Sequence, residues 1–308
     1  MLKRYEGNPI LKPIKEHQWE SELVYNSGAI YQGGRIHLLY NGRNSRDGKS
    51  RLGYASTSDG FHIDKRLNRP IFVPQEMDFE RQAVEDPRLT FLEGKIYITY
   101  DAKLVDKGIC RPAISSIDPE DFINNKWNWS EHRLLFPDHN ESNRNITLFP
   151  EKIKGRYVIY HRPAFYQDIG SIWVAYSYDL RNWTGHKKIA DPRPGLWDDA
   201  KIGAGAPPIK LKEGWLFIYH GVYLKDWSYR LGLMLIDLND PEKILYRSEK
   251  PILEPEKDYE IYGSVSNVVF SSGAVLLQDQ LFVYYGAADN VIAVATAKLS
   301  DLLPTIYQ

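Results

Sequence analysis

The sequence has a single cysteine, Cys110, in 308 residues. An intrachain disulfide is therefore excluded, and a chain without disulfides is typical of a reducing compartment. The first residues, Met1 to Pro9, lack the apolar core of a signal peptide, and no apolar run is long enough to span a membrane. We therefore expect a cytoplasmic protein that does not enter a membrane.

Net charge is nearly absent as well, because 39 Lys and Arg stand against 40 Asp and Glu. Such a balance gives no electrostatic reason to bind nucleic acid or an anionic membrane. Clustered Cys and His are missing, so no metal site is expected. Gly203-Ala204-Gly205 lacks the strand–helix context of a nucleotide loop, and no nucleophile elbow is evident. We therefore expect no cofactor.

No helical period of any length is present, whereas aromatic residues are plentiful, with 21 Tyr, 11 Phe and 8 Trp. Tyrosine and tryptophan favour β-structure. Their ring faces and polar tips also suit sugar-binding clefts, although packing in a β-core explains most such residues. Composition thus favours an all-β protein.

One pattern recurs along the chain: an apolar run, a turn with glycine, an alternating run rich in aromatics, and a further strand. The five copies cover residues 28–60, 87–119, 147–180, 206–238 and 272–297. A shorter segment with a proline recurs at 8–11, 69–72 and 250–253, and it suits an outer edge strand, where proline is tolerated.

Five units of roughly four strands each predict a five-bladed β-propeller formed by the single domain 1–308. We expect residues 8–11 to pair with the last blade. The alternative is a pair of β-sandwiches, but no linker-like change of composition marks a boundary.

In such a fold the residues just before each first strand meet at one mouth. Those positions are Asn26 and Ser27, Glu85 and Asp86, Arg144 and Asn145, Lys201 with 203–205, and 264–267. The stretch Val84-Glu85-Asp86-Pro87-Arg88 stands out, since Pro87 favours an extended backbone at Asp86. Taken alone it fits a structural ion pair, but its place in the repeat favours a site that moves a proton.

Several motifs together resemble glycoside hydrolase family 130, the β-mannoside phosphorylases and a minority of β-mannosidases. They are 84–88, 148–152 with 161–163, 171–177 with 179–183, 201–208 and 285–289, in an order that spans about Tyr5 to Ala297. The family's fold is a five-bladed propeller. The resemblance implies an inverting reaction in which phosphate attacks a non-reducing β-mannosyl unit and releases α-mannose 1-phosphate. It also implies that Asp86 is the general acid, acting through the mannose 3-hydroxyl.

A phosphorylase needs a basic pocket opposite its acid, whereas an inverting hydrolase needs a second carboxyl group about 6.5–9.5 Å away. Arg144, Arg162 and Lys201, with Asn145 as a further donor, match the phosphate-binding positions of the family, and arginine suits phosphate because its planar fork makes two parallel bonds. Inorganic phosphate is thus expected as a co-substrate.

The resemblance also implies that Arg51 and Asp289 hold the mannosyl unit. Further candidates for sugar contacts are Asn26, Arg43, Glu85, His220 and Tyr223. The expected partners are a manno-oligosaccharide and phosphate. A β-mannosidase of the same fold and a non-catalytic, lectin-like propeller are the alternatives. The sequence leaves open a β-1,2 or a β-1,4 linkage and does not determine whether the chain forms a homo-oligomer.

Overall fold

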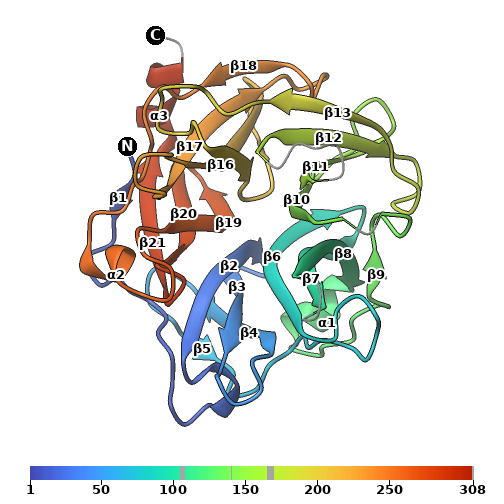
Figure 1. Cartoon of the computed structure of the whole chain (residues 1–308), viewed down its shortest axis with the longest axis vertical. Coiled ribbons are helices and arrows are strands. Elements are labelled where there is room, and N and C mark those ends of the chain that lie inside the picture. Colours follow the sequence, from blue (N-terminus) through green and yellow to red (C-terminus); the bar gives the residue numbers. More distant parts are fainter. Residues whose placement is uncertain (105–107, 140, 165–169, 307–308) are drawn as a thin grey trace.

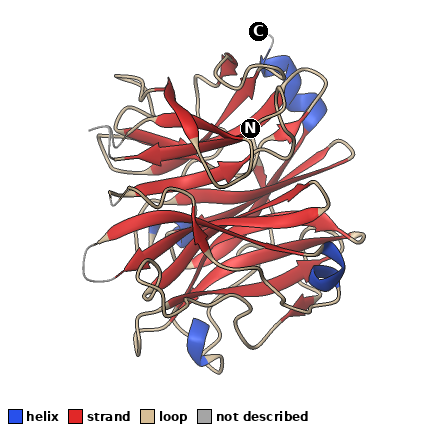
Figure 2. Cartoon of the chain, turned by 90° about the vertical axis from the view of Figure 1, so that its right-hand side faces the viewer, coloured by secondary structure: helices blue, strands red, loops and turns tan. Residues whose placement is uncertain are grey.

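The computed structural model describes residues 1–104, 108–139, 141–164 and 170–306. The fold is all-β, and strands run through the whole molecule while short helices lie at its periphery (Figure 2). The helical segments are η1 (Gln18–Glu20), α1 (Pro119–Ile123), α2 (Asp258–Ile261) and α3 (Leu299–Ile306).

The strands form five consecutive units in which neighbouring strands are antiparallel. Unit 1 contains β2 (Leu23–Gln32), β3 (Arg35–Arg43), β4 (Ser50–Thr57) and β5 (Lys65–Arg66); unit 2 contains β6 (Ala83–Leu92), β7 (Lys95–Leu104), β8 (Ile109–Ile117) and β9 (Arg133–Leu134). A single parallel bridge, Ser50 to Ala83, joins these two units into one sheet. The recurring pattern of the sequence is thus a recurring strand meander.

The other three units are separate sheets, and in the described chain no sheet closes on itself. Unit 3 contains β10 (Asn143–Leu148), β11 (Tyr157–Pro163), β12 (Ile172–Ser177) and β13 (Thr184–Ala190); unit 4 contains β14 (Lys201–Ala204), β15 (Ile209–Lys210), β16 (Trp215–Val222), β17 (Tyr229–Ile236) and β18 (Ile244–Arg247); unit 5 contains β19 (Val269–Leu277), β20 (Gln280–Ala287), β21 (Val291–Lys298) and β1 (Lys3–Arg4). The first strands β2, β6, β10 and β19 face the middle of the molecule (Figure 1).

The three proline-containing segments pair as expected with the third strand of a unit. Leu11 bridges Ile292 of β21, Phe72 bridges Leu52 of β4, and Leu253 bridges Leu231 of β17. The prediction that residues 8–11 join the last unit is therefore confirmed, and β1 pairs with β21 beside them. The two ends of the chain thus lie in the same unit.

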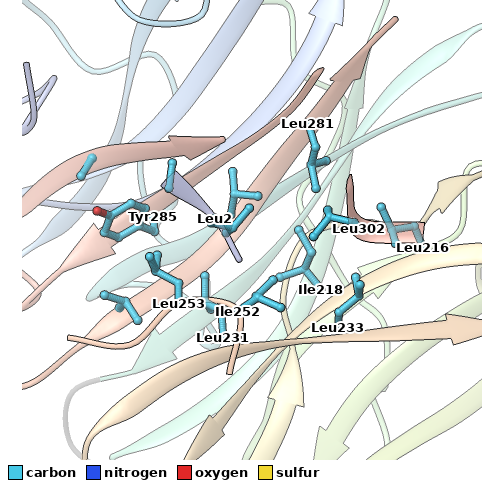
Figure 3. Packing of buried hydrophobic residues seen from close by; sticks show 14 of the residues in the cluster. Leu2, Leu216, Ile218, Leu231, Leu233, Ile252, Leu253, Leu281, Tyr285 and Leu302 are labelled. Carbon is cyan, nitrogen blue, oxygen red and sulfur yellow. The ribbon is translucent and has the colours of Figure 1, made fainter. Parts of the chain in front are cut away.

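Aliphatic side chains fill the spaces between neighbouring units, as Figure 3 shows for units 4 and 5. Leu231 and Leu281 are fully buried there, and Leu2 and Leu302 bring both ends of the described chain into the same cluster. Burying a leucine side chain stabilises the fold by roughly 1.5–3 kcal/mol. Packing between units therefore holds each first strand in place at the centre.

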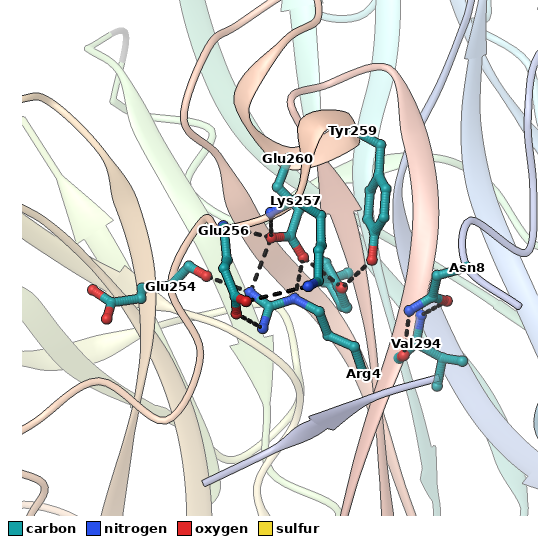
Figure 4. A network of polar contacts seen from close by, with 9 residues as sticks. Arg4, Asn8, Glu254, Glu256, Lys257, Tyr259, Glu260 and Val294 are labelled. Carbon is teal, nitrogen blue, oxygen red and sulfur yellow. Dashed lines mark hydrogen bonds and ion pairs between the residues drawn. The ribbon is translucent and has the colours of Figure 1, made fainter. Parts of the chain in front are cut away.

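In four units, hydrogen bonds link a buried acid, a tyrosine of the second strand and a basic side chain near the outer strand. The four sets are Glu20, Tyr40 and Arg66; Glu80, Tyr100 and His132; Asp198, Tyr219 and Arg247; and Glu260, Tyr285 and Arg4. All four carboxyl groups are fully buried. In unit 5, Glu260 accepts from Arg4 Nε at 2.7 Å (Figure 4), and it also accepts from the hydroxyl of Tyr285 at 2.8 Å. This repeated contact fastens the outer edge of the unit to its middle.

Candidate active site

Asn26, Asp86 and Asn145 occupy equivalent places in units 1, 2 and 3. Each lies where the register of the first strand shifts against the second, which marks a β-bulge. Their φ angles are 42°, 53° and 55°, the left-handed region that most residues avoid. A bulge re-aims the side chain that it carries, and all three side chains line one cavity.

The prediction of an extended backbone at Asp86 was wrong. Pro87 disfavours a right-handed helical conformation at Asp86, but tertiary contacts place the residue in the left-handed region instead. Asn41 accepts the Asp86 N–H at 3.2 Å, and the fully buried Arg88 donates to the Asp86 carbonyl at 2.9 Å. These bonds hold a conformation that costs of order 1–3 kcal/mol, as strained residues at functional sites commonly do.

The cavity at the inner ends of the strands has a volume of about 150 Å³. It is lined by side chains that lie in or beside all five units: Asn26, Asp86, Arg144, Asn145, Arg162, His220, Tyr229, Val265, Val268, Phe270 and Asp289. Seven of these eleven are predicted site residues. The five units thus bring together groups that are far apart in the sequence.

The carboxylate of Asp86 is held through one oxygen. Asn26 Nδ2 donates to Oδ1 at 2.8 Å and Asn41 Nδ2 donates to the same oxygen at 3.3 Å. Among the described residues, no donor contacts Oδ2, so this oxygen is left to exchange a proton with a bound molecule. The geometry suits a general acid, whose reacting oxygen must be within hydrogen-bond reach of its substrate.

Arg144 on β10 and Arg162 on β11 are direct cross-strand partners and both line the cavity. Like charges placed opposite each other destabilise a sheet. Burial lowers the pKa of Arg162, and Arg144 is among the neighbours that add to this effect. Two arginine side chains at one cavity are suited to bind an anion, and the planar fork of a guanidinium group matches a phosphate.

Lys201 is not among the lining residues. Its ammonium lies 5.0 Å from the ring centroid of Tyr229, and the Tyr229 side chain lines the cavity. Asn145 does line the cavity, and its buried Oδ1 has no hydrogen-bond partner among the described residues. Of the four predicted phosphate-binding residues, Arg144, Arg162 and Asn145 thus line the cavity. Lys201 contacts the ring of Tyr229 instead.

His220 contacts Arg162, with Nε2 at 3.3 Å from an arginine NH1. Burial, with Arg162, Arg88 and Lys201 nearby, holds the pKa of His220 well below its usual value, so the ring is neutral. A neutral Nε2 can accept from Arg162. A Cβ at Gly203 would stand 2.5 Å from the His220 ring and 2.6 Å from Asn145 Oδ1, so only glycine lets these side chains approach.

Asp289 is the second carboxyl group in the cavity. Burial, together with Asp86 and Glu85, raises its pKa to about 7. A carboxyl group that is partly protonated at neutral pH can both donate to and accept from a sugar hydroxyl. Because a hydrolase also requires two acids, the arginine pair distinguishes the two chemistries better than the acids do.

Four predicted contacts lie outside the cavity lining. Glu85 is buried, accepts from Tyr25 at 3.0 Å and pairs with Lys103. Arg51 pairs with Asp47 at 2.5 Å. Arg43 is exposed, and Tyr223 lies beneath the guanidinium of Arg230 at 4.9 Å. Their roles stay predictions.

Sequence reasoning missed the apolar wall of the cavity and the residue that holds Asp86. Val265, Val268, Tyr229 and Phe270 form this wall, which suits the C–H face of a sugar ring. Asn41 follows the apolar residues Leu38, Leu39 and Tyr40 near the end of β3. Polar residues at the ends of second strands are the signal that could have identified Asn41.

A larger hollow of about 470 Å³ lies away from this site, between Phe72, Trp127 and Trp129. Its lining contains no lysine or arginine, and its His132 is engaged by Glu80 at 2.7 Å. The acid and the two arginines that line the smaller cavity make it the better candidate for the active site. Within residues 1–104, 108–139, 141–164 and 170–306 no group of acids, His and Cys could hold a metal, and no helix could cross a bilayer.

The family model of glycoside hydrolase family 130, described as β-1,4-mannooligosaccharide phosphorylase, matches residues 1–308. The chain is 40% identical to 1,2-β-oligomannan phosphorylase and 43% identical to β-1,2-mannobiose phosphorylase, both of Thermoanaerobacter sp. (strain X514). The first match covers 98% of both chains and the second 96% of both. The solved complex of β-1,2-mannobiose phosphorylase from Listeria innocua with β-1,2-mannobiose superposes with a TM-score of 0.85. The two chains are 26% identical, and the match covers 99% of each.

Proposed function

This chain belongs to glycoside hydrolase family 130, and we propose that it catalyses inverting phosphorolysis of a non-reducing β-mannosyl linkage in short manno-oligosaccharides. The products are α-mannose 1-phosphate and a sugar shortened by one unit. The observation that carries the proposal is the cross-strand pair Arg144 and Arg162, which lines the same cavity as Asp86.

Asp86 is the proposed general acid. A phosphate oxygen bonds to the anomeric carbon as the glycosidic C–O bond breaks, and the proton passes from Asp86 through the mannose 3-hydroxyl to the leaving oxygen. Asn26 and Asn41 hold one carboxylate oxygen, and Arg88 holds the backbone. Correct placement of the proton donor contributes typically 10²–10⁴-fold to such a reaction.

Phosphate is the proposed co-substrate, bound by Arg144 and Arg162 with Asn145 and Lys201 beside them. Each charge-assisted hydrogen bond to phosphate contributes about 1.5–3 kcal/mol. Asp289 and the wall of Tyr229 and Phe270 are proposed to hold the mannosyl unit. Arg43, Arg51, Glu85, His220 and Tyr223 remain candidate sugar contacts.

We propose a β-1,2 linkage for the substrate. The two Thermoanaerobacter relatives at 40% and 43% identity are both named for β-1,2 substrates, whereas the broader family description names a β-1,4 substrate. The relatives that share more of this sequence carry more weight. Product analysis of the reverse reaction, from mannose 1-phosphate and mannose, tests the linkage directly.

A β-mannosidase of the same fold is the main alternative. Incubating β-1,2-mannobiose with and without phosphate separates the two functions. Formation of mannose 1-phosphate only with phosphate supports the proposal. Release of free mannose without phosphate overturns it in favour of hydrolysis, and no turnover on either the β-1,2 or the β-1,4 disaccharide favours a lectin-like protein.

The architecture that we propose is a single-domain five-bladed β-propeller over residues 1–308. Five meanders, their first strands towards the centre, and a cavity lined from all five units support it. A cytoplasmic location stays a prediction, supported by the single free cysteine Cys110.

A further inference from the structure

Asp101 is a buried carboxyl group without a hydrogen-bond partner. Only 1% of the residue is exposed, and neither Oδ1 nor Oδ2 contacts a donor among the described residues. Buried polar groups in native proteins are nearly always hydrogen-bonded, and a buried charge is normally paired. A carboxyl group left in this state needs an explanation.

The strand that carries Asp101 directs it toward unit 3. Side chains alternate along β7, and Tyr100 and Ala102 pack in the cluster shared by units 1 and 2. Thr99 and Asp101 therefore face the other way, and Thr99 Oγ1 donates to the Ile146 carbonyl on β10 at 3.0 Å. Asp101 thus lies between units 2 and 3, on the side of β10 and its Arg144.

Charged and titratable groups act on Asp101 from five strands: Asp86 and Arg88 on β6, Lys103 on β7, Cys110 on β8, Arg144 on β10 and Arg162 on β11, with Glu85 paired to Lys103. Arg88 donates to three carbonyl oxygens, and Lys103 donates to Glu85. Among the described residues, no hydrogen bond or ion pair engages the guanidinium group of Arg144. The negative charge of Asp101 is therefore available to balance Arg144.

We propose that Asp101 is the internal counter-ion of the phosphate site, ionised while the cavity lacks an anion and taking up one proton from solvent when phosphate binds. This role makes Asp101 a positioning residue, since it acts through Arg144 and Arg162 and does not touch the substrate. The inference rests on the proposed phosphorolysis. It predicts that phosphate affinity is coupled to pH through a residue outside the cavity lining.

The direction of this coupling follows from the charges. Burial and Asp86 raise the pKa of Asp101 to about 7, against the lowering influence of Arg144, Arg88 and Lys103. An anion bound to Arg144 offsets the positive charge that lowers the pKa of Asp101, and it also repels the Asp101 carboxylate. Both effects raise the pKa of Asp101 further. Binding is therefore unaffected by pH below about 7 and weakens above it, by about tenfold per pH unit while one proton must be taken up.

Sulfate is the probe of choice because it does not titrate near neutral pH, so any proton that is taken up belongs to the protein. Calorimetry of sulfate binding at pH 8 in two buffers of different ionisation enthalpy measures the proton count. We expect Asp101→Asn to take up about one proton fewer than the wild-type chain, and any uptake left in the variant belongs to Asp289, which lines the cavity and also has a pKa raised to about 7. The sulfate affinity of Asp101→Asn should also fall less between pH 7 and 8.5 than that of the wild type. Thermal unfolding of Asp101→Asn checks that the variant is folded.

Cys110→Ser is the matched control, because Cys110 is a buried titratable group beside Asp101 that also lies outside the cavity lining. It should retain the wild-type proton uptake. Wild-type uptake that persists in Asp101→Asn, or that disappears in Cys110→Ser, overturns the inference. Sulfate binding without any proton uptake overturns the inference alone. Absence of both sulfate and phosphate binding overturns the proposed phosphate site and the inference with it.

Discussion

Arg144 and Arg162 are direct partners across the β10–β11 ladder, and both line the cavity that Asp86 also lines. Such a pair of like charges costs stability in the empty protein. In the proposed function, a bound phosphate offsets this cost. The arginine pair is expected in a phosphorolytic site, where the nucleophile is an anion. It is not expected in a hydrolytic site, where the nucleophile is an uncharged water molecule.

Replacing one of these arginines should impair the use of phosphate selectively. Arg162→Ala is expected to raise the KM for phosphate by roughly ten- to a hundredfold, since one to two charge-assisted hydrogen bonds are lost. The KM for β-1,2-mannobiose should change much less. Steady-state kinetics with each substrate varied in turn tests this, with the exposed Arg181→Ala as the control. An unchanged KM for phosphate would contradict the assignment.

Asp86→Asn should lower kcat by about 10²–10⁴-fold, because the amide cannot supply the proton. A β-mannoside with a nitrophenol leaving group needs little protonation, so its phosphorolysis should be impaired far less. The two rates are compared in the same variant, and Asp64→Asn, which alters an exposed ion pair with Arg35, serves as the control. Equal losses on both substrates would argue that Asp86 binds the sugar and does not act as an acid.

His220 is expected to aim Arg162 by accepting its N–H. His220→Phe keeps a ring but removes the acceptor, and it should raise the KM for phosphate several-fold. His220→Gln restores an acceptor and should recover part of the loss. If both variants weaken sugar binding and leave phosphate binding intact, His220 contacts the sugar instead.

Glu260 should contribute strongly to stability, although it is far from the chemistry. Glu260→Ala leaves Arg4 and Tyr285 without their shared acceptor and should cost about 3–5 kcal/mol of unfolding free energy. Glu256 pairs with the same Arg4, but its side chain is 61% exposed, so Glu256→Ala should cost about 0–1 kcal/mol. Urea unfolding of both variants tests the difference. An equal loss of unfolding free energy in both variants would show that burial of the carboxyl group does not determine its contribution to stability.

Cys110 should resist alkylation in the native protein. Burial, together with Asp101, raises the pKa of its thiol to about 12, so almost no thiolate is present at pH 8. Labelling should appear only after unfolding, as followed by intact-protein mass spectrometry with iodoacetamide. Rapid labelling of the folded chain would contradict this environment.

Local pattern was sufficient for the strands and for the edge segments, because alternation of apolar residues and the position of proline are properties of neighbouring residues. Together with the resemblance to glycoside hydrolase family 130, which alone indicated Asp289, local pattern also identified seven of the cavity-lining side chains. It failed on the conformation of Asp86, where a bulge and the bonds from Asn41 and Arg88 outweigh the preference that Pro87 imposes.

The sequence by itself determined that the chain is all-β and that it repeats, and it made Asp86 and a set of basic residues the candidates for the chemistry. Only the tertiary structure decided which of those groups meet. The pairing of Arg144 with Arg162 depends on the register of two strands, and the isolation of Asp101 depends on which face of β7 packs against β10. Register and packing are set by contacts between residues far apart in the chain, and such contacts leave no local pattern to read.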